Sequence, residues 1–545
     1  MTLKELQNAM KRPAQLYIIA CAVFLSVCPE ARCGEWRAKF AASQPEAKDR
    51  ERDDSIADSS DVESVLLRDT GWVAQDAEIE TVDGKCDSIE GCAPACPDDD
   101  CAFLSDCLSF GDHLKDIPLG SLCPSGAMDE TTLSFGGQIR YRYMDEDNRL
   151  RPFGPARSTY DLWRWTNYLE LKHTDLFRLY VEMIDASIFD EDLPPTFIDE
   201  NRADILQAYG DVLLFEWGAS PVVLRAGRQF LKYGSQRLVS PLAWANTYRN
   251  FEGIKLFSHG DAWDIDAFAT RPVNGATGNI NRPTSRDQAD ASRTFSGVYA
   301  TYHGASNHTV DFYWLWLREQ EPRVVLADGS RHTIGVRWEG NHAIQDCCGD
   351  VSRTWNWDVE GAYQFGHDND AMGVEQTVKA GFVAGKLSHT WNQVSGTPSI
   401  AGVFHWGSGD DDPNSGDIHT VSTLFPLGHA YWGLIDNFAG QNLIDYSLQA
   451  TVKPTDDLTC VAAIHWFNLA NGNDFVYNVG GVALGPGGTG SNLGQELDLL
   501  ATYKVNEKFS VQAGYFWHWY GDAINNGPLA RDDASQFYVM PTFSY

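Results

Sequence analysis

A short acidic run has the spacing with which calcium-binding loops begin. Asp410, Asp412 and Asn414 place oxygen ligands at alternate positions of the chain. The sixth position is Ser415 instead of glycine, and the twelfth is Val421 instead of glutamate, so the run is not an EF-hand. A surface turn is the first interpretation, and a calcium site that links acidic loops to an acidic polymer is the second. No other cofactor is expected.

Cysteine is concentrated before residue 131. The chain has 12 cysteines, and a compact group of them is Cys86, Cys92, Cys96, Cys101, Cys107 and Cys123. Their even number and their Gly-, Pro- and Asp-rich surroundings favour a disulfide-stapled module whose pairing stays open. A metal site is the weaker alternative, because the group contains no C-x-x-C pair. Cys347 and Cys348 are adjacent and Cys460 stands alone, so their pairing is open as well.

Enzyme signatures are missing from the chain. No G-x-S-x-G, H-E-x-x-H or P-loop pattern occurs. His429 and Tyr431 could act as the base and acid of a polysaccharide lyase, but no spacing rule supports that assignment. The sequence therefore predicts a protein that is not an enzyme.

The elements that must position any site are β-strands. From residue 131 to the end, apolar and polar residues alternate with a period of two, as in Leu497, Leu499 and Ala501 against Glu496 and Asp498. Such stretches begin near residues 133, 162, 176, 205, 221, 251, 263, 295, 309, 331, 357, 372, 400, 445, 458, 496, 509 and 537. A single-chain bacterial barrel has an even strand number, so about 18 strands is preferred to 16.

Alternation also fits a soluble sandwich or propeller, but three features favour a transmembrane antiparallel β-barrel. Trp and Tyr often end the apolar faces, as the membrane interface requires. Long loops rich in Asp, Asn and Gly, such as 145–158, 272–292, 407–420 and 470–494, alternate with short turns. The chain also stops on an aromatic strand that ends at Tyr545.

The expected organisation has four parts. Residues 1–33 read as a signal peptide, because basic residues precede an apolar run and a small-residue region. A lipoprotein signal with Cys21 or Cys28 is the alternative. Residues 34–80 form a polar linker, residues 81–130 a cysteine-rich periplasmic or plug-like module, and residues 131–545 the outer-membrane β-barrel.

The charge balance excludes one class of partner and leaves another open. The chain has 75 acidic and 42 basic residues, a formal charge of −33, which argues against nucleic-acid binding. Residues 34–130 contribute −16 of this charge. On the strand faces predicted to point inward, bases gather before residue 256. They include Arg140, Arg142, Arg164, Arg178, Arg225 and Lys255. A basic wall of this kind would attract anionic solutes.

Two blocks of sequence resemble the alginate export family of outer-membrane barrels. The first runs from Arg225-Ala226-Gly227-Arg228-Gln229-Phe230 through Tyr233–Pro241 to Arg249–Leu256. The second contains Gly407–Asn414, Thr423–Pro426 and His429–Tyr431. The resemblance covers about 131–545 and implies an 18-stranded barrel that passes an anionic exopolysaccharide through an arginine-lined lumen. It adds Arg228, Arg237 and Arg249 to the candidate conducting residues.

Partners follow from this prediction: an anionic polysaccharide, the lipid bilayer, the barrel-assembly machinery and periplasmic export proteins. Arg228 and Arg237 have an alternative role, which is to brace a strand end or a loop. Trp244 is expected to pack against its neighbours more readily than to bind a sugar. A general or anion-selective diffusion porin and a structural or adhesive surface barrel are the alternative functions.

Overall fold

The computed structural model describes residues 114–120, 130–151, 156–196, 198–274, 286–320, 328–369, 373–412 and 415–545. The signal peptide, the linker and most of the cysteine-rich module lie outside these residues, and so do Cys86, Cys92, Cys96, Cys101, Cys107 and Cys123. Among the described residues Cys347, Cys348 and Cys460 are free thiols, and the first two are exposed. The predicted disulfide framework therefore stays a prediction.

Long antiparallel strands make up nearly all of the described chain. They are β2 (Thr131–Asp147), β3 (Ser158–His173), β4 (Phe177–Phe189), β5 (Asn201–Trp217), β6 (Ser220–Gln229), β7 (Phe251–His259), β8 (Trp263–Asn274), β10 (Arg293–Ala305), β11 (His308–Gln320), β12 (Asp328–Gln345), β13 (Val351–Asn369), β14 (Glu375–Trp391), β15 (Ser399–Gly407), β17 (Leu443–Thr455), β18 (Leu458–Leu469), β21 (Asn492–Lys504), β22 (Phe509–Tyr520) and β23 (Ala534–Ser544).

Short elements attach to this wall. β1 (Ile117–Pro118) pairs with β2, β9 (Gln288–Ala289) pairs with β8, and β16 (Asp417–Ile418) runs parallel to β14. β19 (Phe475–Tyr477) and β20 (Ala483–Pro486) form a separate small sheet. The described helices are the 3-10 turn η4 (Gly428–Ala430) and α6 (Asp522–Asn525). No helix among the described residues is long and apolar enough to cross a membrane.

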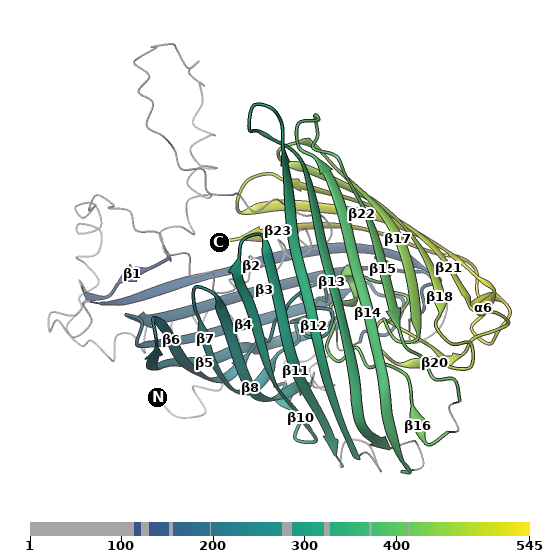
Figure 1. The fold of residues 1–545 in the computed structure, drawn as a ribbon, viewed down its shortest axis with the longest axis horizontal. Coiled ribbons are helices and arrows are strands. Elements are labelled where there is room, and N and C mark those ends of the chain that lie inside the picture. The colour runs from purple at the N-terminus through teal and green to yellow at the C-terminus, as the bar shows by residue number, and fades with distance from the viewer. Residues whose placement is uncertain are drawn as a thin grey trace.

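The sheet closes on itself. Each long strand pairs with the next along the chain, and β2 also pairs with β23 through partners such as Gln138 and Ser544. The first and last strands therefore lie side by side in one tilted wall (Figure 1). The described residues form a closed antiparallel barrel of 18 strands, which confirms the predicted fold and strand number. A closed barrel leaves no unpaired strand edge in the membrane.

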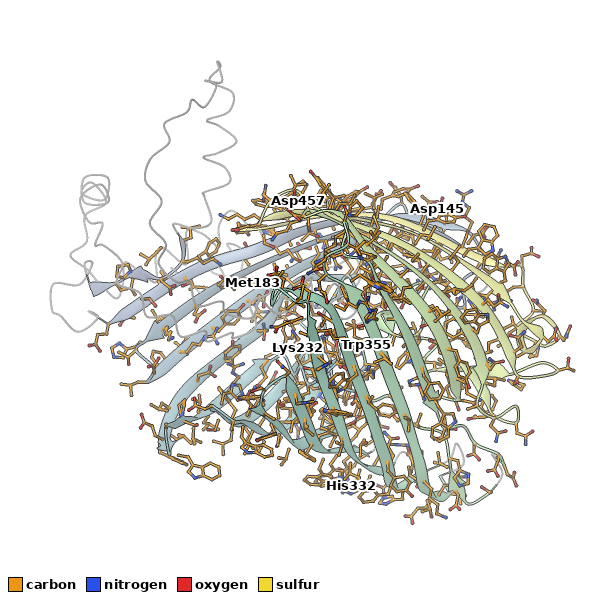
Figure 2. The ribbon with its side chains drawn as sticks, turned by 45° about the horizontal axis from the view of Figure 1, so that its top comes forward. Asp145, Met183, Lys232, His332, Trp355 and Asp457 are labelled. Atoms are coloured by element: carbon orange, nitrogen blue, oxygen red, sulfur yellow. The ribbon has the colours of Figure 1, made fainter. Side chains whose placement is uncertain are left out.

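The two faces of the wall are chemically inverted relative to a soluble protein. On β3, Trp163 and Trp165 are 47% and 36% exposed on the outer face, whereas Arg164 between them is 2% exposed. Other outward aromatic groups gather with histidines near the strand ends, as where His332 stacks between Trp314 and Trp316. Side chains project from both faces of the strands that carry His332 and Trp355 (Figure 2). The outer face therefore suits lipid, and the inner face is polar.

Gly227 is one of the positions where the wall depends on a missing side chain. Its φ of +133° and an added Cβ only 2.2 Å from the Ala208 carbonyl oxygen exclude other residues from the β5–β6 pair. We expect Gly227→Ala to destabilise the barrel by about 2 kcal/mol or more. The measurement is the temperature at which the folded, fast-migrating band of unheated protein is lost from a gel.

Gly402→Ala is the matched control for this prediction. An added Cβ at Gly402 meets nothing within 4 Å, although the residue also lies within a barrel strand. The control should keep the melting temperature of the wild type. Equal melting temperatures for both variants would show that the close approach at Gly227 is not a constraint.

Candidate functional site

Two chain segments fold inward and meet inside the barrel. The first inner segment is residues 230–250, between β6 and β7, and the second inner segment is residues 419–442, between β16 and β17. Phe425 N–H donates to the Leu238 carbonyl at 2.9 Å, and Leu427 N–H donates to the Gln236 carbonyl at 3.0 Å. We predicted an outer loop at 407–420 but not the segment after it, in which the chain continues into the lumen.

Three predicted lumen arginines hold the first inner segment by its main chain. Arg140 donates to the carbonyls of Ala243 at 3.0 Å and Ala245 at 2.7 Å. Arg164 donates to the same two carbonyls at 2.9 and 3.1 Å, and Arg142 donates to the carbonyl of Trp244 at 3.0 Å. Buried carbonyls require donors, and the fork of a guanidinium can supply several at once.

The other part of the first inner segment binds the facing wall. Arg237 Nη1 lies 2.8 Å from Asp358 and 2.9 Å from Glu360, both on β13. Strands β4–β12 separate β13 from β3 in one direction, and β14–β23 separate it from β2 in the other. The segment therefore spans the lumen between roughly opposite walls. Arg237 thus ties this segment to the wall, and its conducting role stays a prediction.

Trp244 lies at the junction of the two inner segments. Its ring stacks on His429 with centroids 3.6 Å apart and an interplanar angle of 6°, and Arg142 covers it at 4.0 Å. The indole Nε1–H donates to Asp436 Oδ2 at 3.0 Å, and His429 Nδ1 lies 3.0 Å from the same oxygen. Burial lowers the pKa of His429, so the imidazole is neutral at pH 7.

His429 and Tyr431, the two candidate groups of the lyase interpretation, are both engaged in this packing. His429 is 3% exposed and its ring face is covered by Trp244. The Tyr431 hydroxyl donates to the carbonyl of Ser235 in the first inner segment. Both residues therefore join the inner segments to each other.

The second inner segment is anchored to the wall by its backbone. Ile435 N–H donates to Glu496 Oε1 at 2.9 Å, and Leu434 N–H lies 3.4 Å from Asp498 Oδ2, both on β21. Gly433 has a φ of +83°, and an added Cβ would lie 2.5 Å from Glu496 Oε1. This close approach explains why the segment has a glycine directly before its anchor.

Several candidate cations are neutralised inside the barrel. Arg228 donates to the Ile205 carbonyl at 2.9 Å and lies 3.3 Å from Glu252, so it braces the strand ends. The ion pairs on the strands are Arg178–Glu170 at 2.7 Å, Arg225–Asp211 at 2.7 Å and Lys255–Asp266 at 2.9 Å. The conducting role of these residues stays a prediction.

Arg142 and Arg249 differ from this pattern. Neither makes an ion pair with a carboxylate among the described residues; Arg249 donates to the carbonyls of Pro426 at 3.1 Å and Ser240 at 3.4 Å. Burial, together with the nearby Arg293, lowers the pKa of Arg249 to about 10, so it remains charged at pH 7. Both buried guanidinium groups donate their hydrogen bonds to neutral carbonyls, although the charge of Asp436 also acts on Arg142. Their field reaches the lumen.

The acidic run predicted as a turn or calcium site is a capped turn in the part that is described. Asp410 accepts from the N–H groups of Asp412 at 3.1 Å and His419 at 3.3 Å. Asp410, Asp411 and His419 place ligand atoms within 4.8 Å of one another. Asn414 lies outside the described residues, so calcium binding at Asp410, Asp412 and Asn414 stays a prediction.

The closed barrel with an apolar outer face and a polar, partly filled lumen defines an outer-membrane β-barrel of the porin type. The model of the family described as "Alginate export" matches residues 131–536, and the chain belongs to that family. The protein is therefore a multi-strand barrel of the outer membrane, from a family of transporters. No curated protein sequence matches the chain significantly.

Solved structures with a similar fold include outer-membrane proteins of Pseudomonas aeruginosa. OccK9 (OpdG) is 13% identical, with a TM-score of 0.51 over 76% of this chain and 98% of that one. The outer membrane protein OprD is 11% identical, with a TM-score of 0.47 over 75% of this chain and 93% of that one. At these identities the comparison bears on the fold alone.

Loosening the first inner segment should widen the conducting path. We expect Arg164→Met to raise the single-channel conductance in planar bilayers, because the carbonyls of Ala243 and Ala245 lose a shared donor. The lost hydrogen bonding should weaken the attachment of the first inner segment to the wall by about 1–3 kcal/mol. Arg157→Met is the control, since Arg157 is an exposed arginine paired with Asp145 at 2.6 Å. Unchanged conductance in Arg164→Met would mean that the segment does not limit ion flow.

The neutral His429 should make the inner assembly sensitive to acid. Its pKa in the assembled state is lowered, so the released state binds the proton more tightly. The equilibrium constant that favours the assembled over the released inner segments is highest above about pH 6.5. It falls as the pH drops below this value, by up to about tenfold per pH unit. Conductance should rise between pH 7.5 and 5.5, and this rise should be absent in His429→Gln. The same rise in that variant would assign the effect to another group.

Proposed function

We propose that the barrel conducts an anionic exopolysaccharide, of the polyuronate type that alginate represents, across the outer membrane. The family match supports polysaccharide transport. The observation that carries the anionic substrate is a pair of buried arginines, Arg142 and Arg249, that lie beside the inner segments and form no ion pair with a described carboxylate. A positively charged passage with low-dielectric walls concentrates anions and disfavours cations.

The chemistry of these groups suits a polymer of uronates. A guanidinium stays charged at any physiological pH and binds carboxylate in a bidentate manner. Arg142 and Arg249 already offer donors to neutral carbonyls, and a carboxylate is the stronger acceptor. Several moderate sites along the path let a chain slide, whereas one tight site would trap it.

A diffusion porin for small solutes is the second candidate function. Most of the candidate cations have carboxylate partners, as Arg225 has Asp211 and Lys255 has Asp266. A lumen whose charges are largely paired is suited to solutes of either sign. The two functions share the same fold and differ in whether Arg142 and Arg249, which form no ion pair with a described carboxylate, select the solute.

Polyuronate block of the channel separates the two functions. We expect oligouronates to block single-channel currents more strongly than neutral oligosaccharides of equal length. Arg142→Gln and Arg249→Gln should each weaken the block about three- to tenfold, which corresponds to about 1 kcal/mol of charge-assisted hydrogen bonding. Raising the salt concentration should also weaken the block, because charges are screened beyond about 8–10 Å at physiological ionic strength.

The design of this experiment removes two ambiguities. The open-channel conductance of each variant is measured first, because both arginines also hold inner-segment carbonyls. Arg157→Gln at the exposed rim and Arg225→Ala, Arg228→Ala and Arg237→Ala, which remove paired cations, serve as comparisons. Equal block by charged and neutral oligosaccharides would favour the diffusion porin over the polysaccharide channel.

A further inference from the structure

A hollow of about 540 Å³ interrupts the outer face of the wall. It lies across β13, β14, β15 and β17, and the first three of these strands are neighbours in the green part of the barrel (Figure 1). Its lining includes Trp357, Val359, Leu387, Phe404, Tyr446 and Leu448. Water does not fill such a space in the hydrocarbon layer, and an empty space forfeits van der Waals contacts, so a membrane component has to occupy it.

Two glycines form the floor of this hollow. Gly385 and Gly402 alternate with outward side chains, since Val383 and Leu387 on β14 are 45% and 52% exposed and Ile400 on β15 is 52% exposed. An added Cβ at Gly402 meets nothing within 4 Å, and one at Gly385 meets its first atom at 3.8 Å. The hollow is therefore the space that two missing side chains leave unfilled.

The hollow belongs to the periplasmic half of the membrane. Leu387 lies four residues before the end of β14, and Gly402 lies three residues after the start of β15. Because the strands alternate in direction, the turn 392–398 between them is at the same end of the barrel as the C-terminus. Other connections at this end, such as 174–176 and 456–457, are short, which marks the periplasmic side.

An unsatisfied imidazole lies between the hollow and that end of the barrel. The outward side chains of β14 follow one another as Leu387, His389 and Trp391. The His389 ring contacts the rings of Trp355 and Trp391, with centroids 4.4 and 4.6 Å away. Its Nδ1 atom is buried without a hydrogen-bond partner, and the ring makes no hydrogen bond with a described residue. The neutral tautomer that leaves no buried donor unpaired has its proton on Nε2, which then donates to a group outside the protein.

Arg353 supplies a cation at the same level. It is exposed on the outer face of β13 and pairs in register with Trp391, so it is a diagonal neighbour of His389 about 7–8 Å away. Its guanidinium has no ion pair and no hydrogen bond with a residue of the described ranges. Asp346 in the adjoining turn is bonded to Gln393 Nε2 at 2.6 Å instead. An interfacial aromatic belt that holds a cation and an N–H donor is complementary to a lipid phosphate.

We propose that this face binds one glycerophospholipid of the periplasmic leaflet. Its phosphate accepts hydrogen bonds from Arg353 and from His389 Nε2, and one acyl chain runs along the wall into the hollow over Gly402. Four residues of a strand rise about 13 Å, so Gly385 is separated from His389 by less than the hydrocarbon of one leaflet, which is about 15 Å thick. The two parts of the site thus match the two parts of one lipid. The inference goes beyond solute passage and does not depend on what the barrel conducts.

A second copy of the barrel fits this face less well than a lipid. In a two-fold dimer the same patch of both subunits meets at the interface. The hollow would then face the hollow of the other copy, and the space over Gly402 would stay unfilled. An acyl chain is flexible and narrow enough to follow the floor of the hollow.

The test uses the full chain in detergent micelles and palmitoyl-oleoyl phosphatidylethanolamine as the probe. Native mass spectrometry measures the fraction of protein that retains lipid as the lipid concentration is raised. We expect the wild type to bind one lipid more tightly than any further lipid. Arg353→Gln should weaken this first binding step about five- to tenfold, because a charge-assisted hydrogen bond is lost. Gly402→Leu should weaken it at least fivefold, because the new side chain fills the hollow.

Two matched controls separate the site from general effects of the substitutions. Arg318 is an exposed outward arginine near the opposite end of β11, and it has no ion pair or hydrogen bond with a described residue. Gly361 is an outward glycine on β13 that does not line the hollow, and an added Cβ there meets its first atom at 3.7 Å. Arg318→Gln and Gly361→Leu should both retain the lipid as the wild type does. The fast-migrating band of unheated protein shows that each variant folds.

Each possible failure contradicts a different part of the proposal. Equal retention in the wild type and both site variants, or an equal loss in the controls, would overturn the site. A loss in Gly402→Leu alone would overturn the phosphate contact, and a loss in Arg353→Gln alone would overturn the acyl contact. Displacement of the lipid by glycerol 3-phosphate, which has no acyl chain, would overturn the role of the hollow. A dimer that Gly402→Leu dissociates would assign this face to a second copy instead of a lipid.

Discussion

The hydrogen bonds from arginines on β2 and β3 to the carbonyls of residues 243–245 are the interaction on which the interior of this barrel depends. A chain that crosses the lumen buries main-chain carbonyls, which need donors. Arg140, Arg142 and Arg164 supply them from the wall. The same bonds set the electrostatics, because a carbonyl satisfies a guanidinium without cancelling its charge. The same arginines therefore hold the first inner segment and keep a positive potential in the lumen.

The wall was predictable because its physical rule is local. Lipid on one side and a polar lumen on the other impose a period of two on every strand, and each of the predicted stretches corresponds to a strand of the barrel. The alternation also placed Arg140, Arg142 and Arg164 on the inner face correctly. Their partners could not be predicted, because residues 243–245 lie about 100 positions away and approach them only in the folded barrel.

The inner segments escaped prediction because they follow no strand period. A signal was nevertheless present: residues 420–442 contain a single charged residue, Asp436, whereas the outer loops are rich in Asp and Asn. A long apolar connection between barrel strands has to be buried, and the lumen is the space available. The first inner segment contains Lys232, Arg237 and Arg249 and no acid, so its acidic partners had to come from elsewhere, as Asp358 and Glu360 do.

The overall charge of −33 is compatible with an anionic substrate, because acids inside the barrel pair with nearby arginines or accept hydrogen bonds from the backbone. Asp358 and Glu360 bind Arg237, Asp211 binds Arg225, and Glu496 accepts from Ile435 N–H. The buried arginines that remain without a carboxylate hold carbonyls, which are weaker acceptors than a uronate. Under the proposed function, a polyuronate that reaches Arg142 would compete with the carbonyl of Trp244 for the same donors. Under the proposed function, this exchange of acceptors would loosen the first inner segment from the wall as the polymer passes.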